Sequence, residues 1–314
     1  MSKDAKKLKL KRGKVVSYNK WGYIFLLPFL IVFTACVIVP QCMTFYYSFC
    51  DYYKSGLKII GPTIKGFDNY AALFTPNVGG EIQILKYFIN TVIMWLMGAI
   101  PQILIALLLA VFFTSYRLNI KGQRFFKTVI YMPNLIMASA FAMLFYNIFS
   151  NVGPVNQILN AMGVETIDFL FITVSSRSLI ALMNFLMWFG NSTLVLMSGI
   201  MGIDTSLFEA ASIDGASSLK VFFKVTLPLL KPILIYCVIT AMIGGIQMYD
   251  VPQVLTNGDG TPNETSYTLM MWLQRFIGES KNYGKGGALS MILFLVSVVL
   301  SLVVFRFMVK KKEA

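Results

Sequence analysis

The chain has 314 residues, of which 57% are hydrophobic and 13% are charged, and its formal net charge is +13. Soluble domains carry roughly 25% charged residues, so this composition excludes an ordinary soluble protein and indicates an integral membrane protein. Histidine is absent, which removes the most common metal ligand and general base and so disfavours a metal centre or a membrane-embedded enzyme.

Six gaps between successive charged residues are each long enough for a helix that crosses the hydrocarbon core, which takes about 17–25 residues. They predict transmembrane spans at roughly 21–46, 85–115, 125–149, 178–200, 232–250 and 286–307. We therefore expect an all-α, polytopic membrane protein with six transmembrane helices. The expected domains are a basic tail at 1–20, a transmembrane domain at 21–308 and a basic tail at 309–314.

The first apolar run follows a basic segment and so imitates a signal peptide. It continues past Cys36 to Val39, which is long for the apolar core of a signal peptide. We interpret it as an uncleaved first helix. Four prolines lie inside predicted spans, and an ordinary helix bend is expected at each of them. They are Pro28, Pro40, Pro101 and Pro133.

Most of the 27 Lys and Arg residues lie in the two termini and in the connections between the second and third and the fourth and fifth predicted spans. Six spans place these four segments on one side of the membrane. Because cytoplasmic segments carry the excess of Lys and Arg, both termini are expected in the cytoplasm. Topology and contact with anionic lipid headgroups then explain the positive charge, and nucleic acid is not an expected partner.

Three long polar stretches, at 50–83, 150–177 and 251–285, fall on the opposite side of the membrane by the same count. The third contains Thr256-Asn257-Gly258-Asp259-Gly260-Thr261-Pro262, which is a strong turn signal. None of the three stretches predicts a separate soluble domain.

The connection 204–231 predicts two short helices joined by a sharp turn. Ser206 and Glu209 have the spacing of a capping box, in which Glu209 reaches back to the helix start. Gly215 fits a helix stop and a chain reversal, and Pro228 lies at the entry to the fifth span. Other residues suited to capping these helices are Asp204, Thr205, Ser217 and Ser218. Alternatively, Glu209 only caps, and the loop is an amphipathic helix at the membrane surface.

The same connection contains a spaced pattern: Glu209-Ala210-Ala211, three residues, Gly215, nine residues, and then Val225-Thr226-Leu227-Pro228. The pattern resembles the "EAA" signature of ABC-importer permeases, with Val225 where isoleucine is usual. The resemblance implies that this loop docks on a separate ATP-hydrolysing subunit. The residues to which it assigns ATPase coupling are Glu209, Ala210, Ala211, Gly215, Leu227 and Pro228. In that role the alanines allow close approach, Gly215 allows the turn, and Glu209 pairs with a basic residue of the ATPase.

Further segments resemble the carbohydrate-uptake class of these permeases, which includes the maltose, multiple-sugar and glycerol-phosphate permeases. They are Gly66-x-x-Asn69-Tyr70, Asn90-Thr91, Tyr131-Met132-Pro133 and the turn at 256–262. The resemblance implies a type I importer permease in the bacterial plasma membrane that moves a sugar or oligosaccharide into the cytoplasm. The implied partners are a second homologous permease, a dimeric ABC ATPase, an extracellular or periplasmic solute-binding protein and membrane lipid.

The sequence has no Walker A motif. ATP and Mg²⁺ are therefore expected on the partner ATPase, with no cofactor, metal or catalytic residue on this chain. We expect a permease and not an enzyme.

Polar residues inside a span usually face the protein interior or a water-filled cavity, and a sugar needs such hydrogen-bond partners together with aromatic faces. Spacings of four and three place Asn184, Trp188 and Asn191 on one face of the fourth span. The fifth span ends in a second group, Gln247, Tyr249 and Asp250, which the resemblance favours as sugar contacts. Alternatively, these side chains only bond neighbouring helices or pack at the membrane interface.

Two other transport functions remain open at the level of sequence. An ion-coupled secondary transporter would act without an ATPase, but such carriers often bury charged relay residues, and the predicted spans are nearly free of charge. An ABC-importer permease for a non-sugar solute would share the loop pattern, so the sugar prediction depends on the weaker resemblances outside that loop.

Overall fold

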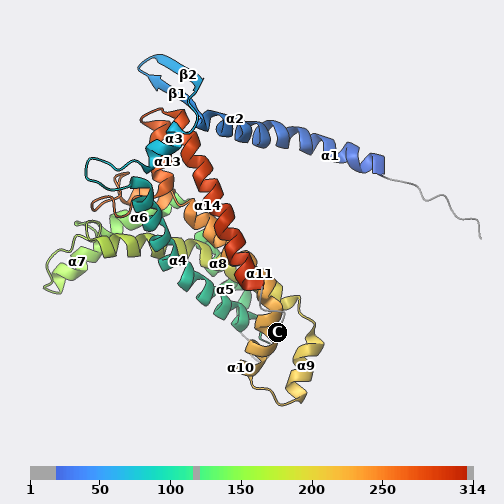
Figure 1. Ribbon diagram of the computed structural model, residues 1–314. Helices are drawn as coiled ribbons and strands as arrows, with labels where there is room; N and C mark the ends of the chain where they lie inside the picture. Colours follow the sequence, from blue (N-terminus) through green and yellow to red (C-terminus); the bar gives the residue numbers. More distant parts are fainter. Residues whose placement is uncertain (1–18, 116–120, 310–314) are drawn as a thin grey trace, which may run out of the picture. The chain divides into compact units, whose positions relative to one another are not determined.

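The computed structural model describes residues 19–115 and 121–309 (Figure 1). Most of the two predicted basic tails, and Arg117 of the second connection, lie outside the described residues. The chain divides into two compact units, Met1–Tyr46 and Tyr47–Ala314. Each unit is described by itself below.

In the first unit, one helix fills the predicted first span. Helix α1 (Asn19–Phe33) continues through a π-helical turn (Thr34–Ile38) into α2 (Val39–Ser48). The wider turn directly precedes Pro40, whose ring would clash with the carbonyl of the preceding turn in a regular helix. Every side chain from residue 21 to 43 is exposed, as expected for a helix surrounded by lipid or by another chain.

The second unit begins with a β-hairpin that the all-α prediction does not contain. Strand β1 (Cys50–Ser55) pairs antiparallel with β2 (Lys58–Ile64). The hairpin is joined to the start of the last span, since the Lys54 amide donates to the Lys281 carbonyl at 2.9 Å. Helix α3 (Asp68–Phe74) follows, and the Asn69 amide holds it to the carbonyls of Ser48 and Cys50.

Long apolar helices occupy four of the other predicted spans and pack against one another (Figure 1). They are α4 (Gln83–Thr114), α8 (Thr173–Met201), α11 (Leu227–Ile246) with its short continuation α12 (Asp250–Leu255), and α14 (Tyr283–Val309). The α4–α8 pair forms the centre of the unit. Gly98 allows the close approach, because a Cβ there would lie 2.9 Å from the Ala181 carbonyl oxygen.

The predicted third span, 125–149, is not one continuous helix, and the expectation of an ordinary bend at Pro133 is wrong. Helix α5 (Gln123–Tyr131) ends in a 3₁₀ turn (Met132–Leu135), and the chain then bends by 92° into α6 (Ala138–Phe149) and α7 (Pro154–Ala161). The turn is held in place because the Asn134 amide donates to the Met187 carbonyl of α8 at 2.9 Å. Among the described residues, five helices are long and apolar enough to span a membrane, or six if this bent pair is one span.

Candidate functional site

The loop between α8 and α11 contains the first predicted helix, α9 (Thr205–Ile213). The prediction of a capping box led by Ser206 is wrong, because the N-cap lies two residues earlier. Its N-cap is Asp204, whose carboxylate accepts the Ser206 backbone N–H at 3.0 Å. This hydrogen bond lowers the pKa of Asp204 below its ordinary value, so the cap stays ionised at neutral pH and is lost only as the pH falls through the lowered pKa.

The predicted helix stop at Gly215 is confirmed. Gly215 has φ +71°, in the left-handed region that favours glycine. The Ala216 N–H donates to the Ala211 carbonyl at 2.9 Å, and the Gly215 N–H donates to the Ser212 carbonyl at 3.1 Å. This pair of bonds is the Schellman arrangement, which satisfies the last carbonyls of α9 and reverses the chain.

The second predicted helix does not end before the fifth span. Helix α10 (Ser218–Val221) starts at the Ser217 cap and continues through a π-helical turn (Phe222–Thr226) directly into α11. In the turn the Leu227 N–H reaches back five residues to the Phe222 carbonyl. The wider turn ends two residues before Pro228, which lacks an N–H and clashes with a regular helical turn.

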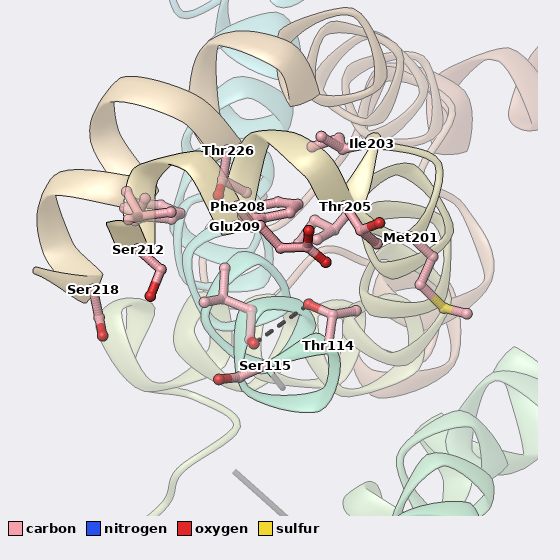
Figure 2. Close-up of a pocket in the computed structure, with 14 residues that line it drawn as sticks. Thr114, Ser115, Met201, Ile203, Thr205, Phe208, Glu209, Ser212, Ser218 and Thr226 are labelled. Atoms are coloured by element: carbon pink, nitrogen blue, oxygen red, sulfur yellow. Dashed lines mark hydrogen bonds between the residues drawn. The ribbon is translucent and has the colours of Figure 1, made fainter. Parts of the chain in front are cut away.

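The two arms of this loop enclose a cavity of about 540 Å³ together with the C-terminal ends of α4 and α8. Glu209 is exposed, and its carboxylate points into the cavity toward Thr114 and Ser115 (Figure 2). Several hydroxyl groups line the same space, among them those of Thr205, Ser212 and Thr226. Among the described residues, no Lys or Arg forms an ion pair with Glu209.

The other predicted coupling residues lie around the same loop. Ala210 is exposed and Ala211 half-buried on α9, so neither side chain obstructs the approach of another surface. Leu227 is half-buried and Pro228 exposed at the start of α11. The loop therefore presents a small-residue helix face and a carboxylate that no Lys or Arg of the described residues pairs with.

The structure brings one predicted substrate residue of α8 close to the fifth-span group. The Asn184 amide donates to the Ile180 carbonyl at 2.9 Å and contacts the Met248 sulfur at 3.5 Å. Met248 lies between Gln247 and Tyr249, in the short interruption between α11 and α12. Asn184 thus borders the interruption from the side of α8.

The remaining predicted substrate residues differ in how they are placed. Gln247 and Asp250 are exposed, whereas Tyr249 is half-buried and packs against the hydrophobic core around α13 (Leu269–Gly278). Trp188 is 48% exposed, and Asn191 is half-buried. Both lie further along α8, and within the described part of the chain neither forms a hydrogen bond with the 247–250 group.

Two polar residues that the sequence does not predict connect to this interruption, one directly and one through a loop. Thr268 is fully buried and donates its hydroxyl to the Met248 carbonyl at 2.9 Å. Arg177, in the first turns of α8, binds the loop that leads to Thr268. Pro252 is the sequence feature that could have indicated a need for such a donor. It stands four residues after Met248 and cannot supply the N–H that the Met248 carbonyl would accept in a helix.

Comparison with known proteins adds three findings. The family described as "Binding-protein-dependent transport system inner membrane component" matches residues 102–312. The chain is 28% identical to the "Probable ABC transporter permease protein YesP" of Bacillus subtilis, over 92% of this chain and 90% of that protein. It is 27% identical to the "Arabinooligosaccharides transport system permease protein AraP" of Halalkalibacterium halodurans, over 89% of this chain and 85% of that protein.

A solved structure shares the fold. It is a bacterial ABC transporter involved in the import of the acidic polysaccharide alginate, and one of its chains matches with a TM-score of 0.74 at 22% identity. The match covers 94% of this chain and 97% of that chain, so it includes nearly every element described above.

Proposed function

The chain belongs to the family of binding-protein-dependent transport system inner membrane components, and on that premise we propose that it imports a sugar or oligosaccharide. It is a multi-pass inner-membrane permease subunit. ATP is hydrolysed by a separate ABC ATPase that also holds Mg²⁺, and this chain binds no cofactor. The solute is delivered from outside by a solute-binding protein, and a second, homologous permease completes the pathway.

Two similarities support a carbohydrate as the transported solute. A curated relative is named for arabino-oligosaccharides, and the solved transporter of the same fold is described as importing a polysaccharide. The exposed amide of Gln247, the carboxylate of Asp250 and the indole of Trp188 add the hydrogen-bonding and aromatic groups that sugar recognition requires. We assign substrate contact to Gln247, Tyr249, Asp250, Asn184, Trp188 and Asn191.

The observation that supports an ATP-driven importer is the carboxylate of Glu209 at the loop cavity, which forms no ion pair within the part of the chain that the structure describes (Figure 2). A basic side chain of the ATPase fits this cavity, since the surrounding hydroxyls accept hydrogen bonds and the carboxylate supplies the opposite charge. We assign ATPase coupling to Glu209, Ala210, Ala211, Gly215, Leu227 and Pro228.

Copurification tests the proposal first. The chain is tagged in its own cell and extracted in mild detergent, and its companions are identified by mass spectrometry. We expect a second permease and an ABC ATPase, and we expect the reconstituted complex to take up sugar only with ATP and the solute-binding protein. Recovery of the chain alone, together with ATP-independent transport in liposomes, would instead establish a secondary carrier.

A further inference from the structure

The interruption between α11 and α12 leaves one backbone carbonyl without its helical partner. The Met248 carbonyl would ordinarily accept the N–H of residue 252, but that residue is proline. Within a predicted membrane span an unsatisfied carbonyl is costly, because no surrounding lipid can donate a hydrogen bond. A donor from elsewhere in the chain is therefore required at this point.

Thr268 supplies that donor. Its hydroxyl donates to the Met248 carbonyl oxygen at 2.9 Å, and its side chain is 0% exposed. The Thr268 hydroxyl oxygen itself accepts the Met271 N–H at 3.2 Å and so caps α13. One buried hydroxyl thus joins the interruption to the start of α13.

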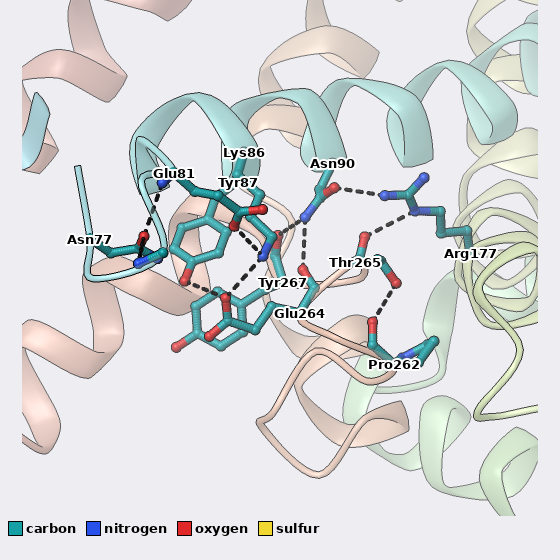
Figure 3. Close-up of polar contacts among 11 residues, drawn as sticks. Asn77, Glu81, Lys86, Tyr87, Asn90, Arg177, Pro262, Glu264, Thr265 and Tyr267 are labelled. Atoms are coloured by element: carbon teal, nitrogen blue, oxygen red, sulfur yellow. Dashed lines mark hydrogen bonds and ion pairs between the residues drawn. The ribbon is translucent and has the colours of Figure 1, made fainter.

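The loop before Thr268 is held against the N-terminal end of α4. Asn90 is 4% exposed, and its amide donates to the Glu264 carbonyl at 2.8 Å and to the Tyr267 carbonyl at 3.3 Å (Figure 3). The Glu264 carboxylate accepts the Tyr87 hydroxyl at 3.0 Å and lies 3.5 Å from the Lys86 ammonium. Glu264 has φ +58°, a conformation that an L-residue adopts at a cost, so these contacts hold the turn in place.

Arg177 connects this loop to α8. Its Nε donates to the Thr265 carbonyl at 2.9 Å, and its Nη2 donates to the Asn90 side-chain oxygen at 2.7 Å (Figure 3). No carboxylate among the described residues forms an ion pair with it. The half-buried Arg177 guanidinium binds only neutral oxygens among these groups. Because its planar fork sets the angle between two acceptors, it fixes the position of the loop relative to α4.

We propose that Thr268 and Arg177 are positioning residues for the substrate segment 247–250. Arg177 holds the 261–268 loop on the ends of α4 and α8, and Thr268 transmits that position to the Met248 carbonyl, between Gln247 and Tyr249. The proposal deepens the proposed function, because it rests on the assignment of 247–250 to substrate.

Amide hydrogen exchange of the purified full complex, read by mass spectrometry on peptides covering 247–256, tests the positioning directly. Thr268→Val removes the hydroxyl at similar size, and we expect exchange there to accelerate about tenfold, the effect of one lost hydrogen bond at a buried carbonyl. Thr268→Ser keeps the hydroxyl and restores wild-type exchange to within about twofold. Arg177→Met accelerates exchange in the same peptides.

Two control variants and one control peptide make the test specific. Thr240→Val removes a hydroxyl that bonds only carbonyls of its own helix α11, and Arg124→Met removes an exposed cation of α5. Both leave exchange at 247–256 unchanged, and peptides covering α9 stay at the wild-type rate in every variant. Wild-type exchange at 247–256 in Thr268→Val, or equal acceleration across the whole chain, would overturn the proposal.

Uptake of radiolabelled arabinotriose by the reconstituted complex separates this proposal from the proposed function. We expect Thr268→Val to raise the half-saturating concentration more than it lowers the maximal rate, with rescue by Thr268→Ser. Absence of ATP-dependent uptake of this and other oligosaccharides by the wild type would overturn sugar import, whereas unchanged exchange would overturn the positioning alone.

Discussion

At the scale of single residues, each proposed site contains an exposed polar side chain that has few partners among the described residues. Glu209 faces a cavity lined by both hydroxyl-bearing and apolar side chains, and Gln247 is exposed beside the interruption of the fifth span. A polar side chain that the fold does not use for its own hydrogen bonds is available to a ligand or a partner subunit. Substitution at such a position should therefore change function and leave the fold intact.

Glu209→Lys tests the carboxylate of the loop. The change places a cation where the ATPase is proposed to present one, so uptake should fall at least about tenfold, because a broken interfacial charge pair costs about 2 kcal/mol or more. Less ATPase should copurify, while the amount of membrane-inserted permease stays constant. Glu165→Lys, on the exposed segment between α7 and α8, is the matched control. Wild-type uptake by Glu209→Lys would remove this residue from the coupling set.

Gln247→Ala tests substrate contact. The variant loses one amide that can bind a sugar hydroxyl, and we expect sugar-stimulated ATPase activity and uptake to fall with subunit assembly unchanged. Gln274→Ala, an exposed glutamine of α13, should leave both activities at the wild-type level. If Gln247→Ala also leaves both unchanged, Gln247 does not contact the substrate.

At the scale of elements, the long helices could be predicted from sequence, but several of their ends and interruptions could not. Gaps between charges locate α4, α8 and α14 because burying charge in hydrocarbon is costly. The 92° bend after Pro133 could not be predicted, since it depends on the Asn134 bond to α8 and a proline alone does not set an angle. The hairpin was missed because its second strand, Lys58–Ile64, is exposed along its whole length and so has no alternation of buried residues.

The candidate sites divide in the same way. The helix stop at Gly215 was predicted, because glycine at a helix end has a strong local signature. Asn90 bonds Arg177, 87 residues away, and Glu264, 174 residues away. No local sequence pattern predicts a contact between positions so far apart. Asp204 displaced Ser206 as the N-cap because both residues satisfy the same local rule, and only the folded chain decides between them.

Gly215→Pro tests the turn between α9 and α10. Proline fixes φ near −65° and has no N–H, so it can neither adopt φ +71° nor bond the Ser212 carbonyl. We expect loss of uptake and of ATPase capture, with membrane insertion retained. Gly215→Asn tolerates the left-handed conformation and should keep most of the activity. Normal uptake by the proline variant would contradict a role of this turn in coupling.

Adjacent glycines of α11 provide an internal comparison of helix packing. A Cβ at Gly245 would collide with the Trp95 indole, whereas a Cβ at Gly244 meets no atom within 4 Å. Gly245→Ala should destabilise the protein by about 1–3 kcal/mol, as overpacking of a filled contact does. Gly244→Ala should be neutral or slightly stabilising, because alanine favours helix. Thermal unfolding in detergent measures both, and equal midpoints would contradict the close α4–α11 contact.

At the scale of the whole molecule, the distribution of Lys and Arg leads us to propose that both termini lie in the cytoplasm. The hairpin and the 261–268 loop then face outward, where a solute-binding protein delivers its ligand, and the α9–α10 loop faces the ATPase. A single orientation thereby places each proposed partner on the side of the membrane where its ligand or nucleotide is found.

Cysteine labelling with a membrane-impermeant maleimide tests this orientation. Lys58→Cys in the hairpin should react in cells whose plasma membrane is exposed to the reagent, whereas Lys121→Cys before α5 should react only after permeabilisation. The parent chain, with its four native cysteines, provides the background. The reverse pattern would place the α9–α10 loop outside and exclude an ATPase partner there.

The unbroken passage from α10 through the π-helical turn into α11 has a mechanical consequence. From Ser218 to Ile246 the chain is continuously helical, with a length of about 43 Å at 1.5 Å per residue. When a helix of that length tilts as one body by about 5° about its loop end, its far end is displaced by about 4 Å. We propose that a small displacement at the loop end, where the ATPase is expected to dock, is transmitted along this helix to the interruption where Gln247 and Tyr249 lie.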